Sequence, residues 1–280
     1  MPRYGLLADI HGNLPALRAA VEHLTDHGAE RWLCAGDVVG YGPEPNECVA
    51  ELAGLAALSV AGNHELIALG ELSGARCSRR ARESLDWTRG ELTARSRDHL
   101  AALPRTLAVP GLVMAHGSLS DPEEYIRGPG QARAQLERLA EDHPDAHVLV
   151  LGHTHRAMLH RAGAGPEPVS YDVRTPLDPG GRYLVNPGSV GQSREREARP
   201  RARFALIDLP AEPGAVASVR FFALPYDDRA VRARLRARRL PADSMHVQPG
   251  TMATARRRAR RLPGYLAIWP GGSSVVDLSM

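Results

Sequence analysis

Two histidines, residues of a type that binds metals, directly follow an apolar stretch of the chain, within residues 151–157. There the letters LGHTHRA follow the run HVLVL and present His153 and His155 with one threonine between them. In an extended chain, residues two apart point to the same face. The two imidazoles are therefore expected to project side by side from a strand end. Such a pair needs partners from elsewhere in the chain before it can bind a metal or move a proton.

Four further apolar stretches end in the same way. ADIHGN contributes Asp9 and His11, AGDVVGYG contributes Asp37, AGNHE contributes Asn63 and His64, and MAHGS contributes His116. Ligands of open α/β sheets collect outside the carboxyl ends of the strands. If each stretch is a strand, these side chains are expected to converge with the first pair.

The donor atoms in this set are oxygen and imidazole nitrogen, with no thiolate. That mixture suits Mn²⁺, Fe, Co, Ni or Zn better than a structural cysteine-type zinc site. With His64 set aside, seven side chains remain. Each of two ions obtains four protein ligands only if one carboxylate bridges them. The pattern therefore predicts a binuclear centre.

The elements that must position these residues alternate between strand and helix at the start of the chain. Strands are expected over residues 4–10, 31–35 and 55–61, a helix capped by Asn13 follows the first, and a helix over 44–55 follows the second. This βαβαβ order predicts a parallel sheet covered by helices. Residues 65–102 are helical in composition, with Gly70, Gly74 and Gly90 as breaks.

The second half of the chain favours strands. A hairpin is expected over 106–109 and 112–115, because Pro110-Gly111 is a turn dipeptide, and a helix over 131–141 leads into the strand 147–151. The later strands, at 156–161, 182–185, 204–209 and 216–224, are expected to form a second sheet. The Gly- and Pro-rich stretch 162–181 is expected to be a loop.

Composition places the chain among globular proteins of the cytoplasm. It has 280 residues, of which 43% are hydrophobic and 24% charged, and its apolar runs are too short for a membrane span. The N-terminal apolar run is too short for a secretory signal. Three cysteines in no CxxC spacing (Cys34, Cys48 and Cys77) indicate reduced thiols. We expect no membrane association.

The positive charge is concentrated near the C-terminus. Residues 229–263 carry eleven arginines and a single acid, Asp243, although the net charge of the chain is only +3. A solvated helix face explains this stretch better than an interaction tail, but both interpretations remain open.

The ordered motifs D-x-H, G-D, G-N-H-E, H-G and G-H-T-H resemble the calcineurin-like metallophosphoesterase superfamily over about residues 3–210. GDVVGYGPEPNE, HGSLSDPEEY and NPGSVGQSR resemble more narrowly its bacterial phosphodiesterase and diadenosine-tetraphosphatase-like branch. Gly40-Tyr41-Gly42 stands where phosphoprotein phosphatases carry Asp-Arg-Gly, which argues against that activity. The resemblance implies a four-layer α/β/β/α sandwich with two mixed sheets flanked by helices, and a binuclear site at the carboxyl ends of the strands.

The resemblance also implies roles for individual residues. Asp37 bridges two divalent transition-metal ions, Mn²⁺ being favoured over Fe, Zn, Co or Ni. His64 is the expected general acid, oriented by Glu65 or another carboxylate, and is expected to contact substrate together with Asn63. Arg194, in GQSRERE, is expected either to reach a substrate phosphate or to lie solvated on the surface. The remaining ligands divide between a first metal, held by Asp9, His11 and His155, and a second, held by Asn63, His116 and His153.

The expected function is hydrolysis of small phosphodiesters or nucleotides by in-line attack of a metal-bridging hydroxide. Residues 1–225 are expected to form the catalytic domain, with 65–102 as a helical insertion or cap. Residues 226–280 are expected to form an arginine-rich helical extension that packs on the domain or on a partner, with a homodimer as one such arrangement. Two alternatives remain: a nuclease whose arginine-rich tail follows nucleic-acid phosphates, and a non-catalytic scaffold on the same fold.

Overall fold

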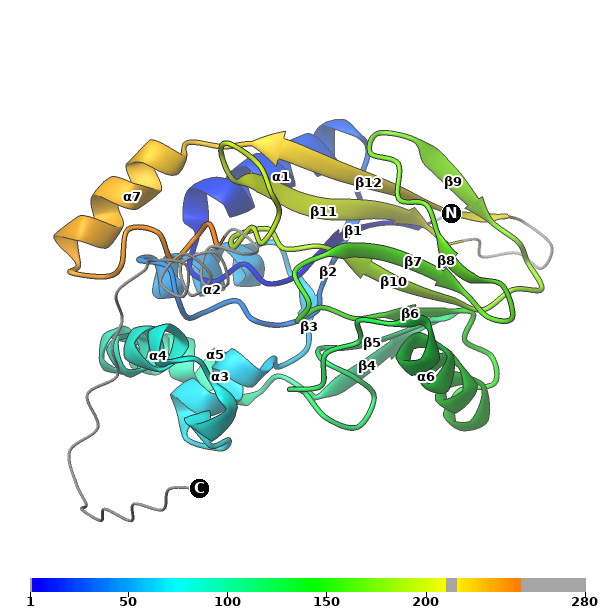
Figure 1. Cartoon of the computed structure of the whole chain (residues 1–280), viewed down its shortest axis with the longest axis horizontal. Helices are drawn as coiled ribbons and strands as arrows, with labels where there is room; N and C mark the ends of the chain where they lie inside the picture. The colour runs from blue at the N-terminus through cyan, green and yellow to red at the C-terminus, as the bar shows by residue number, and fades with distance from the viewer. Residues whose placement is uncertain (1, 210–215, 248–280) are drawn as a thin grey trace, which may run out of the picture.

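Two six-stranded mixed sheets lie face to face, with helices on their outer faces, in a computed structural model that describes residues 2–209 and 216–247 (Figure 1). This is the predicted four-layer α/β/β/α sandwich. The first sheet has the order β3 (Leu58–Ser59), β2 (Arg31–Cys34), β1 (Arg3–Leu7), β11 (Arg201–Asp208), β12 (Ala217–Pro225) and β9 (Arg174–Leu177). The second has the order β4 (Thr106–Val109), β5 (Leu112–Ala115), β6 (Val148–Val150), β10 (Tyr183–Pro187), β7 (Ala157–Arg161) and β8 (Gly165–Glu167).

The helices divide between the two outer faces and one end of the sandwich (Figure 1). Beside the first sheet are α1 (Leu14–Asp26), α2 (Pro45–Gly54) and α7 (Asp228–Ala237), and beside the second is α6 (Pro129–Asp142). The stretch expected to be a helical cap contains α3 (Asn63–Leu69), the 3₁₀ helix η1 (Gly74–Arg76), α4 (Arg79–Glu91) and α5 (Ala94–Ala101). None of the helices in the described ranges is both long and apolar enough to cross a membrane.

Three buried clusters account for the layering. Alternate residues of β1 point to opposite faces, so Leu6 packs between the sheets while Leu7 packs against the helices. On the helix side Leu7 meets Leu17 of α1. A third cluster joins β5 and β6 to α6 through Val113 and Leu149. Each sheet therefore buries both faces, which explains why the strands read as continuous apolar runs.

Local signals define the first helix as the sequence predicted. The side chain of Asn13 accepts a hydrogen bond from the backbone N–H of Ala16, and Pro15 lies in the first turn. The buried residues Leu14, Leu17 and Leu24 repeat at helical spacing along one face. This helix begins only a few residues after β1 ends, so the two elements flank the loop that carries Asp9 and His11.

Several expectations about the strands need correction. β11 and β12 do not join the second sheet: β11 pairs antiparallel with β1, as in the pairing of Arg3 with Asp208, and β12 follows it. The stretch expected to be a loop at 162–181 contains β8 and β9, which pair with β7 and β12. β8 forms a short hairpin with β7, whereas the pairings of β11 with β1 and of β9 with β12 join distant segments, which local composition does not reveal. Gly90 lies inside α4 instead of ending it.

The strands that carry the polar clusters share one direction within each sheet. β1, β2 and β3 are parallel in the first sheet, and β5 and β6 are parallel in the second. Their carboxyl ends open at the same end of the sandwich, beside α3 (Figure 1). The fold therefore brings together loops that lie far apart in the sequence.

Candidate metal centre

The loops that carry the predicted ligands turn sharply as soon as the strands end. Five of these ligands have left-handed backbone, a conformation that L-residues other than glycine rarely adopt and that clusters at functional sites. Their φ angles are 53° at Asp9, 51° at His11, 55° at Asp37, 63° at His153 and 61° at His155. The expectation that His153 and His155 project from an extended chain is therefore wrong, although both side chains still reach the centre.

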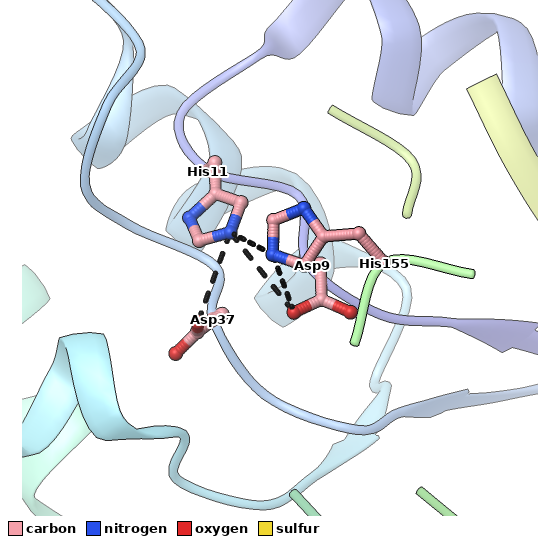
Figure 2. Close-up of side chains that lie close together, drawn as sticks. All are labelled: Asp9, His11, Asp37 and His155. Carbon is pink, nitrogen blue, oxygen red and sulfur yellow. Dashed lines mark hydrogen bonds and ion pairs between the residues drawn. The ribbon is translucent and has the colours of Figure 1, made fainter. Parts of the chain in front are cut away.

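The first group of side chains consists of Asp9, His11, Asp37 and His155, whose ligand atoms all lie within 4.8 Å of one another (Figure 2). The Nε2 atoms of His11 and His155 face each other at 3.1 Å. His155 Nε2 lies 3.3 Å from Asp9 Oδ1, and His11 Nε2 lies 3.7 Å from Asp37 Oδ2. All four side chains are buried.

The second group shares Asp37 with the first. Asp37, His116 and His153 offer ligand atoms within 4.8 Å of one another, and all three are buried. His116 Nε2 lies 3.3 Å from Asp37 Oδ2 and 3.1 Å from Asn63 Oδ1, so Asn63 belongs to the same group. The structure thus brings all seven predicted ligands into two adjacent groups that meet at Asp37. Their division matches the predicted one, and their roles as ligands remain a prediction.

Backbone carbonyls orient the four histidines for cation binding. The Nδ1 atoms of His11, His116 and His155 face the carbonyls of Val39, Ala35 and Gln192, and Nε2 of His153 faces the carbonyl of Glu123. A carbonyl only accepts, so each of these ring nitrogens carries the proton. In the neutral ring the opposite nitrogen then presents a lone pair to the centre.

Two further observations show that this donor set fits metal ions. The lone pairs of His11 and His155 point at each other across 3.1 Å, an arrangement that a cation or a shared proton must hold together. Asp9 Oδ2 is buried without a hydrogen-bond partner among the described residues. Burial of so many polar atoms in one place is costly unless they are paired or coordinate a metal. The site is compatible with divalent metal ions.

Positive charges around Asp37 stabilise the ionised form of its carboxyl group. Burial alone would raise the pKa of this carboxyl, but the charges of His116 and His64 outweigh it and hold the pKa well below its usual range. For His116 burial opposes the charged form, yet Asp37 outweighs burial and raises the pKa to about 9. Without a metal, these two groups therefore form an ion pair.

Burial governs the remaining groups. It raises the pKa of Asp9 to about 8. It lowers the pKa values of His11 and His155 well below the usual range, and that of His153 to about 3. Three histidines are thus neutral and able to donate lone pairs at physiological pH.

His64 lies beside the two groups and faces the cavity. It is the second residue of α3, which begins at Asn63. Its backbone N–H donates to Asp37 Oδ1 at 2.9 Å, and its Nε2 lies 4.0 Å from Asp37 Oδ2. Burial lowers its pKa. Glu65 does not orient it: that carboxylate instead accepts from the backbone N–H groups of Asp37, Val39 and Gly62 and ties two loops together.

A cavity of about 580 Å³ opens over the centre. Arg194 lines it, and its guanidinium contacts Gln192 Oε1 at 3.1 Å and the Tyr125 hydroxyl at 3.5 Å. None of the ion pairs found in the described residues involves this arginine. The predicted substrate residues Asn63, His64 and Arg194 therefore line one cavity.

Sequence reasoning missed several residues around this cavity. Tyr125 packs against His153 with tilted rings whose centroids lie 3.9 Å apart, and Tyr41 meets His11 edge-on at 4.8 Å. Both tyrosines lie in segments that carry family-like motifs, which was the available signal. Residues 76–81, from η1 to the first turn of α4, and Val247 also line the cavity, and no motif in the sequence singles them out individually.

Comparison with known proteins agrees with this geometry. The family model described as the calcineurin-like phosphoesterase superfamily domain matches residues 3–212. An uncharacterized protein of Methanocaldococcus jannaschii is 30% identical over 199 residues, which cover 68% of this chain and 76% of that protein. The crystal structure of a metallophosphoesterase from Sphaerobacter thermophilus has a TM-score of 0.71 at 30% identity, covering 87% of this chain and 97% of that one.

A hypothetical protein from Pyrococcus horikoshii has the same fold, with a TM-score of 0.68 at 22% identity, over 88% of this chain and 96% of that one. The family model spans every loop that contributes to the two groups of side chains. The sequence match and the buried Asp and His groups at the strand ends lead to one conclusion: the chain belongs to the calcineurin-like phosphoesterase superfamily.

Proposed function

We propose that this protein is a metal-dependent phosphodiesterase that hydrolyses small phosphodiesters or related nucleotides. The observation that carries the proposal is the pair of buried groups meeting at Asp37, at the base of a cavity of about 580 Å³. A cavity of this size suits a nucleotide-sized ligand. We favour two Mn²⁺ ions as the cofactor, because the donor set combines carboxylate and amide oxygen with imidazole.

The two metal ions would be held by Asp9, His11, Asp37 and His155 on one side and by Asp37, Asn63, His116 and His153 on the other. When bound, they supply positive charge for the phosphoryl oxygens and a hydroxide nucleophile near neutral pH. The carbonyl contacts of the four histidines hold the lone pairs in place before substrate arrives, so little reorganisation is needed.

The side chains that face the cavity act on the substrate itself. Arg194 has an unpaired charge and a planar set of donors, which suit a phosphate oxygen pair. His64 lies on the side of Asp37 open to the cavity, where its Nε2 can hydrogen-bond the phosphoryl group or protonate the leaving alkoxide. Ester groups of the substrate would then lie against Tyr125 and the cap residues 76–81.

The arginine-rich region gives the nuclease alternative little support within the described residues. Arg234 of α7 pairs with Glu44, and Arg238, which directly follows α7, pairs with Glu91. These charges are engaged by the body of the protein, so they are not free to follow a nucleic-acid backbone. The rest of the arginine-rich stretch, from residue 248 onward, lies outside the described residues.

The test compares bis-p-nitrophenyl phosphate with p-nitrophenyl phosphate on chelator-stripped protein, with and without added Mn²⁺. We expect Mn²⁺-dependent hydrolysis that favours the diester. Asp37→Ala is expected to abolish turnover and to lower the metal content of both groups, because this carboxylate belongs to each of them. The exposed Asp145→Ala serves as the matched control and is expected to behave as wild type. Full activity and full metal occupancy in Asp37→Ala would disprove the bridging role.

A further inference from the structure

Residues 241–247, which follow α7 and lie beyond the family match to residue 212, contact three separate walls of the cavity. Asp243 pairs with Arg80 at the start of α4 at 3.1 Å. Ser244 Oγ donates to the carbonyl of Tyr41 at 3.3 Å. The carbonyl of Ser244 accepts from the side-chain amide of Gln192 at 2.8 Å.

The segment is firmly packed against the body. Ser244 is fully buried, and Met245 belongs to the core between the first sheet and its helices. Its backbone also pairs with the loop of Gln192, since Ser193 N–H donates to Met245 and Val247 N–H donates to Ser193. Val247 then reaches the cavity and lines it.

Gln192 is the residue on which these contacts converge. Its side-chain oxygen accepts from Nε of Arg194 at 3.1 Å, while its side-chain amide donates to Ser244. Its backbone carbonyl accepts from Nδ1 of His155 at 2.9 Å, and its N–H donates to Ser189 Oγ. Gln192 is 1% exposed, so all four of its polar groups are satisfied without water.

We propose that Gln192 is a positioning residue for substrate binding, and that residues 241–247 act through it and through Val247 as part of the substrate pocket. This inference rests on the proposed function of the site. The side chain of Gln192 holds the guanidinium of Arg194 toward the cavity, and Ser244 in turn fixes the orientation of the amide. The substrate pocket is therefore completed by a segment that the family domain does not include.

The first test is a double-mutant cycle in the full-length, Mn²⁺-loaded protein with bis-p-nitrophenyl phosphate as substrate. Gln192→Leu removes both side-chain hydrogen bonds but keeps the backbone contact to His155. We expect it to raise KM by about tenfold, as for loss of a hydrogen bond to a charged group, with kcat and metal content close to wild type. Arg194→Gln is expected to raise KM by roughly 10–100-fold, and the exposed Arg138→Gln is its control.

If Gln192 acts through Arg194, the double variant is expected to bind substrate no more weakly than Arg194→Gln alone, because coupled residues are not additive. The positioning role would be overturned if the KM increases of the two single variants multiplied in the double variant. An unchanged KM or a loss of metal in Gln192→Leu would also overturn it. A merely structural role would lower the amount of active enzyme without changing KM.

The second test addresses Val247. Val247→Trp adds bulk to the cavity wall and is expected to raise KM for the diester severalfold with unchanged metal content, whereas the exposed Val173→Trp is expected to have no effect. Equal KM values in both variants would overturn the role of the segment in the pocket.

The inference can be separated from the proposed function. Calorimetry of inorganic phosphate binding to the metal-loaded variants reports on the pocket even if neither ester is hydrolysed. Absence of turnover in wild type, with phosphate binding weakened in Gln192→Leu and Arg194→Gln, would contradict the phosphodiesterase activity and support the positioning role. Turnover in wild type with equal phosphate affinity in all variants would support the phosphodiesterase activity and contradict the positioning role.

Discussion

His64 lies at the centre but belongs to neither of the two groups of predicted metal ligands. It contacts Asp37 through its own backbone, and its ring lies between His11, at a centroid distance of 4.6 Å, and Tyr41, at 4.9 Å. Its Nδ1 is buried without a hydrogen-bond partner in the described part of the chain. A side chain held by ring packing beside the two groups of predicted ligands is suited to contact a substrate.

Removal of His64 is therefore expected to slow turnover without releasing metal. His64→Ala is expected to reduce kcat on the order of 10²–10⁴-fold, as for loss of a general acid or a transition-state donor. Metal content measured by elemental analysis is expected to match wild type. The exposed His147→Ala is the control. Loss of metal in His64→Ala would show that this residue is a ligand instead.

The loops that follow the strands set the geometry of the centre. The loop after β2 runs beside α3, and Gly40 in this loop has a φ of 84°. A Cβ at this position would lie 2.1 Å from Nδ1 of His64, which is closer than any side chain allows. Gly40 is the first residue of the Gly-Tyr-Gly that stands where phosphoprotein phosphatases carry Asp-Arg-Gly, and it is thus required by the packing of the imidazole. This loop supplies no arginine to the cavity; Arg194, from the loop after β10, is one of the arginines that line it.

Gly40→Ala is expected to displace His64 and to lower kcat by on the order of 10²-fold, approaching the loss in His64→Ala. It is also expected to destabilise the protein by about 1–3 kcal/mol, because alanine at a left-handed position is strained. The control is Gly90→Ala in α4, where a Cβ meets nothing within 4 Å. That change is expected to keep full activity and to stabilise by about 0.5–1 kcal/mol. Wild-type kcat in Gly40→Ala would contradict the close packing.

Proton binding couples the centre to the stability of the whole molecule. In the metal-free protein the pKa of Asp9 is about 8 because of burial. That of His116 is about 9, because Asp37 outweighs burial. Both values lie above those of the unfolded chain, about 3.9 for Asp and 6.5 for His. Above about pH 6.5 the buried histidines with lowered pKa values are neutral in both states. There the native state binds more protons, and its free energy of unfolding falls as pH rises from about 6.5 to 9.

Metal binding, in contrast, strengthens as pH rises, because ions bind only deprotonated ligands. The increase in unfolding temperature caused by Mn²⁺ is expected to be larger at about pH 8.5 than at about pH 6, since ligand binding stabilises the native state in proportion to affinity. Thermal unfolding with and without Mn²⁺ at both pH values measures this. Asp37→Ala is expected to show little increase at either. An increase that is equal or smaller at the higher pH would contradict the coupling.

The amino-acid sequence was enough to predict the family, the layered α/β fold and the side chains that gather at the centre. Strand ends, caps and apolar periodicity are local, so Asp9, His11 and Asp37 could be placed behind their strands without any tertiary information. Local signals also predicted the cap of α1 and the hairpin of β4 and β5. Arg194 was identified as a substrate residue, and it does line the cavity.

Which distant segments meet became visible only in the folded chain. The pairing of β11 with β1 joins residues about 200 positions apart, and Asp9 accepts from the backbone N–H of His153, 144 positions away. The left-handed loops, the four contacts of Gln192 and the arrival of Val247 at the cavity have the same origin. Each depends on long-range packing and on satisfying buried polar groups, and no short stretch of sequence encodes either.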